Sequence, residues 1–140
     1  MRKLELIVEG EVVGKARPRV TRYGAYTPAK TKNYERAIQL AFQNKYKGLV
    51  PLKKPLRMEI DCYMYIPKNT SNIRRKRKNA KEILPDKKPD FDNMAKSITD
   101  ALNGLAYEDD NQIVDARIRK FFSDDQRAEI RIAEVEEEGI

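Results

Sequence analysis

Hydrophobic and polar side chains alternate in four stretches of the chain. Successive side chains of an extended strand point to opposite faces, so this alternation predicts strands with one buried and one exposed face. The predicted strands are residues 2–9, 56–66, 113–122 and 127–135. The second is the clearest, and Pro67 ends it. Because only a turn at Asp124-Asp125 separates the last two strands, we expect residues 113–135 to form a hairpin.

Two further stretches place apolar side chains three and four positions apart, which is the spacing of one face of an α-helix. The first predicted helix covers residues 32–46, with Thr31 as its N-cap and Gly48 just beyond its end. The second covers residues 91–103 and is followed by Gly104. The remaining segments, 10–24 and 67–89, show no sustained period and are expected to be irregular connections.

These elements follow one another in the order β-α-β-(basic loop)-α-β-β. We therefore expect an α+β fold, in which a mixed four-stranded sheet carries two helices packed on one face. A length of 140 residues corresponds to one domain, so residues 1–140 are predicted to form a single unit with one core.

Positive charge is concentrated in two segments. The formal net charge is +7, and residues 67–89 alone hold nine basic and two acidic side chains. A second basic stretch contains no acidic residue from Val12 to Tyr34. Such segments favour a polyanionic partner, although residues 67–89 could also be a solvated loop without one. The candidate nucleic-acid-binding residues are Lys15, Arg17, Arg19, Arg22, Arg74, Arg75, Lys76, Arg77, Lys78, Lys87 and Lys88.

The residue types that are missing exclude several classes of chemistry. The chain contains no histidine, which excludes histidine acid–base catalysis, Ser-His-Asp and Cys-His pairs, and histidine-ligated zinc. Its one cysteine, Cys62, cannot form an intramolecular disulfide and is expected to be a core thiol. No apolar run is long enough for a membrane span and no signal-peptide pattern occurs, so we expect a cytoplasmic protein without membrane contact.

The densest polar cluster lies at the start of the second predicted helix. Asp90 and Asp92 are two positions apart where the chain enters the helix, so both carboxylates can point the same way while Phe91 points into the core. Lys96 follows Asp92 by one helical turn. Asp110 lies further along, but the loop after the helix is long enough to span back along it, so the geometry permits Asp110 to return to the same point.

Three carboxylates at one point repel one another unless some are protonated or a cation lies between them. Oxygen ligands favour Mg²⁺ or Mn²⁺ over zinc, and a carboxylate–metal site beside a lysine suits phosphodiester hydrolysis. A structural interpretation is also open for each residue: Asp92 as a helix cap, Lys96 as a surface ion-pair partner, and residues 108–111 as a polar turn. Spacing alone does not decide between the two.

Residues 88–114, with the sequence KPDFDNMAKSITDALNGLAYEDDNQIV, resemble the signature of the RusA-type Holliday junction resolvases, which are endodeoxyribonucleases. The shared pattern is Asp-x-Asp-Asn, a lysine four residues after the second aspartate, Asp-Ala-Leu, and a closing Asp-Asp before a strand. The upstream run GKARPRVTRYGAYTPAKTKNYE is similar to family members from prophages and phages of Gram-positive bacteria. Together the resemblance spans most of the chain.

The resemblance implies a small α+β homodimer that binds four-way DNA junctions. It implies Mg²⁺, with Mn²⁺ able to substitute and no small-molecule cofactor, and resolution by paired symmetric nicks during DNA recombination and repair. The family's metal-binding aspartates match Asp90, Asp92 and Asp110, its catalytic lysine matches Lys96, and Asp109 is a further candidate ligand. In enterobacterial members basic residues adjoin the first aspartate, whereas here Lys87, Lys88 and Pro89 precede it and most of the positive charge lies further upstream. We expect residues 67–89 to be a DNA-binding loop that can be disordered without DNA.

Two other functions are compatible with the sequence. A non-catalytic nucleic-acid-binding module would use the acidic cluster for capping and solubility, and would need no divalent ion there. A nuclease for flaps, forks or other branched DNA would use the same residues as a junction resolvase. Selectivity for the shape of the DNA would then lie in the geometry of the dimer, which the sequence does not reveal.

Overall fold

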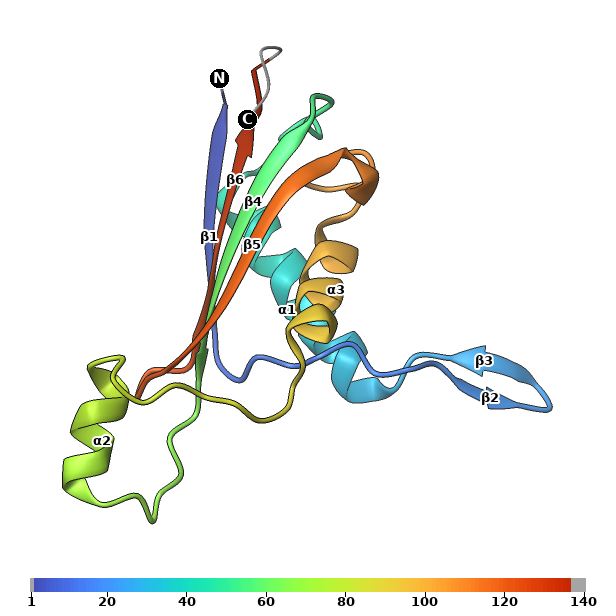
Figure 1. Ribbon diagram of the computed structural model, residues 1–140. Helices are drawn as coiled ribbons and strands as arrows, with labels where there is room; N and C mark the ends of the chain where they lie inside the picture. Colours follow the sequence, from blue (N-terminus) through green and yellow to red (C-terminus); the bar gives the residue numbers. More distant parts are fainter. Residues whose placement is uncertain (1, 137–140) are drawn as a thin grey trace.

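The computed structural model describes residues 2–136, which contain a four-stranded sheet and a separate two-stranded one (Figure 1). The large sheet has the strand order β1-β6-β4-β5. Its strands are β1 (Lys3–Glu9), β4 (Leu56–Met64), β5 (Ile113–Phe122) and β6 (Arg127–Glu134). β6 is antiparallel to β1 and β4, whereas β5 is parallel to β4. The predicted α+β fold with a mixed sheet is confirmed.

The hairpin predicted over residues 113–135 is wrong, because β4 lies between β5 and β6. Tyr63 of β4 pairs with Phe121 on one side and with Arg127 on the other, so the short turn after β5 crosses the end of β4. Residues 60–63 of β4 are all buried. A strand buried on both of its faces gains most from a neighbour on each side, and this outweighs the short connection.

Helices α1 (Ala29–Lys45) and α3 (Phe91–Leu102) pack against each other on one face of the sheet (Figure 1). The core lies between these layers, where Ile38, Ile60 and Ile98 are at most 3% exposed. Cys62 is fully buried there, and burial raises the pKa of its thiol to about 12. Two helices on one face and a core thiol are both as predicted.

Helix α1 begins earlier than predicted, and Thr31 is not its N-cap. Pro28 holds that position, while Thr31 lies in the first turn and is 1% exposed. The Thr31 hydroxyl accepts a hydrogen bond from the N–H of Ala16 (3.2 Å) and donates one to the carbonyl of Gly14 (3.4 Å). This hydroxyl therefore holds the loop that follows β1 against the helix.

Both segments predicted to be irregular contain regular structure. The segment 10–24 runs into a small hairpin of β2 (Arg19–Thr21) and β3 (Gly24–Tyr26). The segment 67–89 contains helix α2 (Asn72–Asn79), whose first turn is capped by the Ser71 hydroxyl accepting from the N–H of Arg74 (3.3 Å). The predicted element order lacks all three. Helix α2 escapes a periodicity search because charged side chains surround it rather than one apolar stripe.

The face of the sheet opposite the helices is charged. Asp61 lies at its centre, 5% exposed, and its carboxylate accepts hydrogen bonds from Arg119 (2.7 and 2.8 Å) and Arg131 (2.9 Å). Burial alone would raise the pKa of Asp61, but the two arginines lower it below its ordinary value. Arg131 also contacts Glu59 at 3.3 Å and Glu129 at 3.9 Å. The charges on this face therefore neutralise one another.

Several segments meet at one end of the molecule. Strands β1, β4 and β5 end there, α3 begins there, and both α2 and the β2–β3 hairpin project from it on different sides (Figure 1). Within the described residues, no helix is both long and apolar enough to cross a membrane. This end of the molecule carries the candidate site.

Candidate active site at the amino end of helix α3

Asp90 and Asp92 lie where α3 begins, and neither is used to stabilise the helix by a side-chain cap. Asp90 occupies the N-cap position with extended backbone, but its carboxylate makes no capping hydrogen bond. Asp92 lies in the first turn, and both residues are exposed. Neither forms a salt bridge within residues 2–136. The alternative interpretation of Asp92 as only a helix cap is therefore wrong, and the partial positive charge at the helix end favours both carboxylates.

Phe91 does not point into the core as predicted, since 64% of it is exposed. The helix starts at this residue, so Met94 and Ile98 supply its buried face and Phe91 lies on the outer side. Phe91 lines an open hollow together with Asp90 and Asp92. The site is thus an exposed pair of carboxylates on either side of an exposed aromatic ring.

Lys120 from β5 lines the same hollow and was missed by the sequence analysis. Its ammonium donates hydrogen bonds to the carbonyls of Lys87 and Pro89, the latter at 3.0 Å. It thereby holds the segment that delivers Asp90. The sequence did contain a clue to Lys120. Ile118, Lys120 and Phe122 alternate along the strand on the face toward the helices, where a charged residue is unusual.

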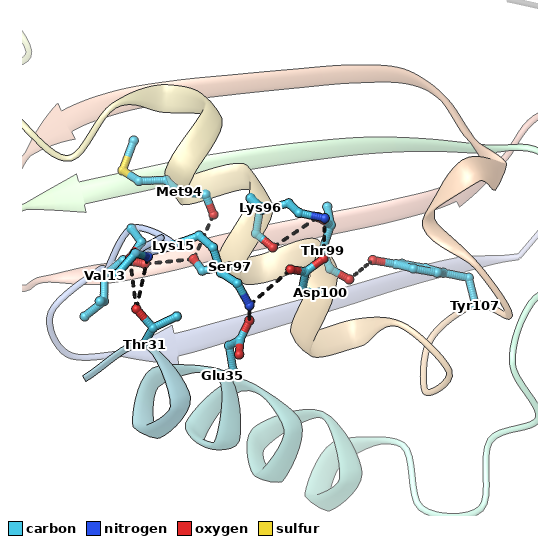
Figure 2. A network of polar contacts seen from close by, with 12 residues as sticks. Val13, Lys15, Thr31, Glu35, Met94, Lys96, Ser97, Thr99, Asp100 and Tyr107 are labelled. Carbon is cyan, nitrogen blue, oxygen red and sulfur yellow. Dashed lines mark hydrogen bonds and ion pairs between the residues drawn. The ribbon is translucent and has the colours of Figure 1, made fainter. Parts of the chain in front are cut away.

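A network of ion pairs joins α1 to α3 (Figure 2). The Lys15 ammonium lies between Glu35 (2.8 Å) and Asp100 (3.2 Å), and Lys96 binds the other oxygen of Asp100 at 2.9 Å. Burial alone would lower the pKa of Lys15, but its hydrogen bonds to both carboxylates raise it overall. Lys15 was predicted to bind nucleic acid, and in the structure its ammonium pairs with Glu35 and Asp100. The sequence analysis did not identify Glu35 as part of the site.

Hydrogen bonds to the backbone of the loop after β1 hold this loop on α3. The N–H of Lys15 donates to the carbonyl of Asn93 (2.8 Å), and the Ser97 hydroxyl donates to the carbonyl of Val13 (2.8 Å). Gly14 lies so close that a Cβ there would come within 2.9 Å of the Pro89 Cβ. Only a glycine allows the loop to lie this near to the residues that precede Asp90.

Asp110 returns to α3, but to Lys96 rather than to the hollow. It begins the short 3₁₀ helix η1 (Asp110–Gln112). Burial and a hydrogen bond with the adjacent Asp109 raise the pKa of Asp110. The pKa of Lys96 is raised mainly by Asp100 and further by the charge of Asp110. The predicted pairing of Lys96 with an acid on α3 is therefore present, and Asp110 lies within its electrostatic reach.

Asp109 has a structural role. Its carboxylate accepts from the N–H of Asn111 (3.2 Å), and the Gln112 side chain accepts from the N–H of Asp109 (2.9 Å). Nearby, the Tyr107 hydroxyl donates to the carbonyl of Thr99 (2.7 Å), which ties this turn to α3 (Figure 2). The predicted polar turn at residues 108–111 is present, and Asp109 caps it.

The predicted three-carboxylate metal site was tested against this geometry. Asp90, Asp92 and Asp110 offer only oxygen donors, which suits Mg²⁺ or Mn²⁺. No group of three acidic or cysteine side chains in residues 2–136 is gathered closely enough to hold a metal ion. The chemical type of these donors suits a hard cation. Asp90 and Asp92 line the same hollow, whereas Asp110 lies near Lys96.

Helix α2 uses part of its positive charge to hold its own position. The Lys78 ammonium lies 4.5 Å from the centre of the Phe122 ring and only 9% of the residue is exposed. Arg75 binds the carboxylate of Asp124, and Arg77 pairs with an acid just beyond the helix. These three predicted nucleic-acid contacts therefore also have structural partners within the chain.

Some of the other predicted contacts share a cleft with Asp90. A cleft of about 1150 Å³ between α2, the segment before α3 and the loop after β1 reaches Asp90. Several predicted contacts make no salt bridge within the described residues: Arg17, Arg19, Arg22, Arg74, Lys76, Lys87 and Lys88. Arg19 and Arg22 belong to the β2–β3 hairpin and Arg17 precedes it, Arg74 and Lys76 lie on α2, and Lys87 and Lys88 line the cleft with Asp90.

Comparison with known proteins places these features in a family. The family model described as Endodeoxyribonuclease RusA matches residues 9–133, which include the β2–β3 hairpin, α2 and the carboxylates. The chain is also 36% identical over 138 residues to "Uncharacterized protein YqaN" of Bacillus subtilis (strain 168), covering 94% of this chain and 96% of that protein. The resemblance inferred from the motif is confirmed: this chain belongs to the RusA endodeoxyribonuclease family.

Proposed function

We propose that the protein is a metal-dependent endodeoxyribonuclease that resolves Holliday junctions by paired symmetric nicks. The observation that carries the proposal is the pair of exposed carboxylates, Asp90 and Asp92, without salt-bridge partners in the described chain and in a hollow that three lysines also line. A basic surface attracts the DNA backbone, and free carboxylates at its centre provide for chemistry rather than for affinity. Membership of an endodeoxyribonuclease family supports the same reading.

The divalent ion belongs to the proposal. Asp90 and Asp92 would hold Mg²⁺, or Mn²⁺, at the hollow, and Asp110 would complete the ligand set by moving from its place near Lys96. When bound, such an ion supplies an activated water and neutralises charge on the phosphate. The chain itself supplies donors that are solvent-accessible and a segment held in place by Lys120.

Lys96 is proposed to stabilise charge on the scissile phosphate. Its side chain is 57% exposed and shares Asp100 with Lys15, so Asp100 keeps a cationic partner when Lys96 turns to a phosphate. The raised pKa of Lys96 keeps it protonated throughout the neutral range. A fixed cation beside the reacting phosphate is worth most where charge develops in the transition state.

The basic residues of α2 and of the β2–β3 hairpin are proposed to bind the DNA backbone on either side of the cut. Contacts of this kind carry little sequence information and weaken as the salt concentration rises. A homodimer completes the proposal, because two opposed strands must be cut and a twofold protein presents two identical sites to a twofold junction.

The test is nicking of a labelled synthetic four-way junction, with the matched linear duplex, a fork and a flap beside it, in Mg²⁺ and in EDTA. Wild type should cut opposed strands of the junction only when Mg²⁺ is present. Asp90→Asn should lose cutting while binding the junction at least as tightly, since one repulsive charge is removed. Asp115→Asn is the matched control, because Asp115 pairs with Arg57 on the charged sheet face and should keep full activity.

Two outcomes would contradict the proposal. Tight junction binding without cleavage in Mg²⁺ or Mn²⁺ would indicate a binding module. Cleavage by Asp90→Asn at the wild-type rate would remove the carboxylates from the chemistry. A readout besides activity is the melting temperature in Mg²⁺: the ion should raise it for wild type and Asp115→Asn, and less for Asp90→Asn.

A further inference from the structure

The β2–β3 hairpin, called the arm below, stands away from the body of the protein (Figure 1). All of its strand residues, Arg19–Thr21 and Gly24–Tyr26, are exposed. A two-stranded hairpin with water on both faces is only marginally stable by itself. The arm therefore contributes little to the core, and its sequence is free to serve a partner.

The tip of the arm has a defined shape. The strands pair from Arg19 opposite Tyr26 to Thr21 opposite Gly24, which leaves Arg22 and Tyr23 as the turn. The Thr21 hydroxyl accepts from the N–H of Tyr23 and donates to the carbonyl of Gly24, both at 3.2 Å. Gly24 has a φ of +121°, which other residues rarely adopt. These contacts present one aromatic ring at the end of the arm.

That ring is unusually open to solvent. Tyr23 is 89% exposed, and the Arg22 guanidinium lies 5.5 Å from the centre of its ring. Val20, on the strand below, is 81% exposed. A rigid aromatic ring held in water beside a guanidinium provides a flat, uncovered face with a positive charge at its side. Nucleic-acid bases stack on such faces.

Charge decides what kind of partner fits the arm. Arg17, Arg19 and Arg22 form no salt bridge within residues 2–136, and no acidic residue occurs from Val12 to Tyr34. The arm is therefore uniformly positive. A second copy of this chain would bring a net charge of +7 to it, whereas a phosphate backbone would bring negative charge. The complementarity favours nucleic acid.

The arm is also fixed relative to the carboxylates at its base. The chain that leads into it is bound to the start of α3 through the N–H of Lys15 and the carbonyl of Asn93 (2.8 Å). The N–H of Ala16 is held by the Thr31 hydroxyl at 3.2 Å. The base of the arm therefore has a fixed position relative to a nucleic acid that is bound at Asp90 and Asp92.

We infer that Tyr23 stacks on a base exposed at the branch point of the DNA, while Arg19 and Arg22 bind the phosphates beside it. The inference rests on the proposed function and names the feature of the substrate that the arm reads. A continuous duplex covers both faces of its bases, so stacking by an external ring requires the open steps of a branch. The arm thus favours branched over linear DNA.

The experiment uses the full chain carrying Asp90→Asn, which prevents cutting, and a four-way junction with 2-aminopurine at the branch point. Binding should change the 2-aminopurine fluorescence. The change should persist in Tyr23→Phe and disappear in Tyr23→Ala and in Tyr23→Leu, which keeps apolar area but no ring. Loss of one stacked base should weaken junction binding by about 10-fold, with linear-duplex binding unchanged.

Controls separate the arm from the rest of the protein. Val50→Ala removes an exposed apolar side chain that belongs neither to the arm nor to the cleft, and should keep the signal. Equal loss of junction and linear binding in Tyr23→Ala would overturn the inference. Loss of self-association in light scattering, with the fluorescence change intact, would overturn it in favour of a second copy as partner. Circular dichroism of each variant excludes unfolding as the cause.

The outcome is distinguishable from that of the proposed function. If wild type nicks junctions in Mg²⁺ and no Tyr23-dependent signal occurs, the inference about the arm fails alone. If wild type does not nick any substrate but the signal depends on Tyr23, the arm reads branched DNA in a protein without nuclease activity. The second result supports the inference and contradicts the nuclease.

Discussion

Two charged regions of this molecule use the same residue types in opposite ways. On the open face of the sheet, Asp61 accepts hydrogen bonds from two arginines and is 5% exposed. At the start of α3, Asp90 and Asp92 are exposed and take no part in a salt bridge within the described chain. The first region satisfies its charges internally, while the second leaves them available.

The difference separates structural from functional charge. A buried carboxylate with two cationic partners stabilises the folded state, because removing it strands its partners. An exposed carboxylate without partners contributes little to the stability of the fold, so it stays available to an external cation or substrate. Substitutions in the first region should therefore change stability, and those in the second should change activity.

The largest expected effect is at Lys96. In Lys96→Met the nicking rate should fall roughly 100- to 1000-fold, the usual cost of losing one group that stabilises developing charge. The free energy of unfolding should change by less than about 0.5 kcal/mol, because the ion pair with Asp100 is partly exposed. Single-turnover nicking and urea unfolding provide the two measurements.

Lys53→Met is the matched control for this variant. Lys53 forms an exposed pair with Glu108 away from the hollow and should keep the wild-type rate. Equal nicking rates for Lys96→Met and Lys53→Met would show that Lys96 does not take part in the reaction. The separation of charges for stability from charges for activity would then be contradicted.

A smaller effect is expected at Asp61, and on the other property. Asp61→Asn should lower the free energy of unfolding by about 2 kcal/mol, below the usual cost for a fully buried pair because Arg119 and Arg131 are partly exposed. Nicking by the folded protein should be unchanged. Urea unfolding and the junction assay below the unfolding transition test both statements.

The pH dependence of this effect follows from the lowered pKa of Asp61. Its ordinary value is 3.8, and the folded-state value is lower. Its stabilisation is therefore complete at neutral pH, and is lost as pH falls below the ordinary value and through the folded one. The difference between wild type and Asp61→Asn should be constant from about pH 6 to 8 and shrink below about pH 4. A constant difference down to pH 3 would contradict this assignment.

The smallest effect is expected at Lys120, which makes structural contacts but holds the segment that carries Asp90. We assign it as a positioning residue, because its ammonium donates hydrogen bonds to the carbonyls of Lys87 and Pro89 in the segment before Asp90. In Lys120→Met the Mg²⁺ concentration needed for half-maximal nicking should rise about 10-fold, as for other groups that orient metal ligands.

Lys120→Arg should retain most of the wild-type Mg²⁺ dependence, because it can still donate to a carbonyl. A drop in the maximal rate at saturating Mg²⁺, with the half-maximal concentration unchanged, would show that Lys120 acts in another way. The Mg²⁺ titration is therefore the decisive readout, rather than activity at one concentration.

Local patterns predicted much of this fold. The apolar rows of β1 and β4 and the spacing in α3 are dictated by side chains a few residues apart, and all three elements occur as expected. The motif around Asp90 also identified the family, which the family model confirms. Features fixed by neighbours in sequence were accessible to sequence analysis.

Features fixed by distant neighbours were not accessible. The insertion of β4 between β5 and β6 depends on which strand is most buried, and the short turn suggested otherwise. Lys15 is basic in sequence, but its partners Glu35 and Asp100 come from two helices. Helix α2 is held by contacts such as Lys78 with Phe122, which no periodicity reveals.

The position of β6 has a consequence for how the chain is made. It is the last of the four strands to be synthesised, yet it lies between β1 and β4 and pairs with both. Until it emerges from the ribosome, Leu4 and Leu6 on β1 have no neighbouring strand to pack beside. Long-range pairing of this kind slows folding and leaves apolar rows open to chaperones and to other nascent chains. The sheet therefore closes late, when its final strand threads into the centre.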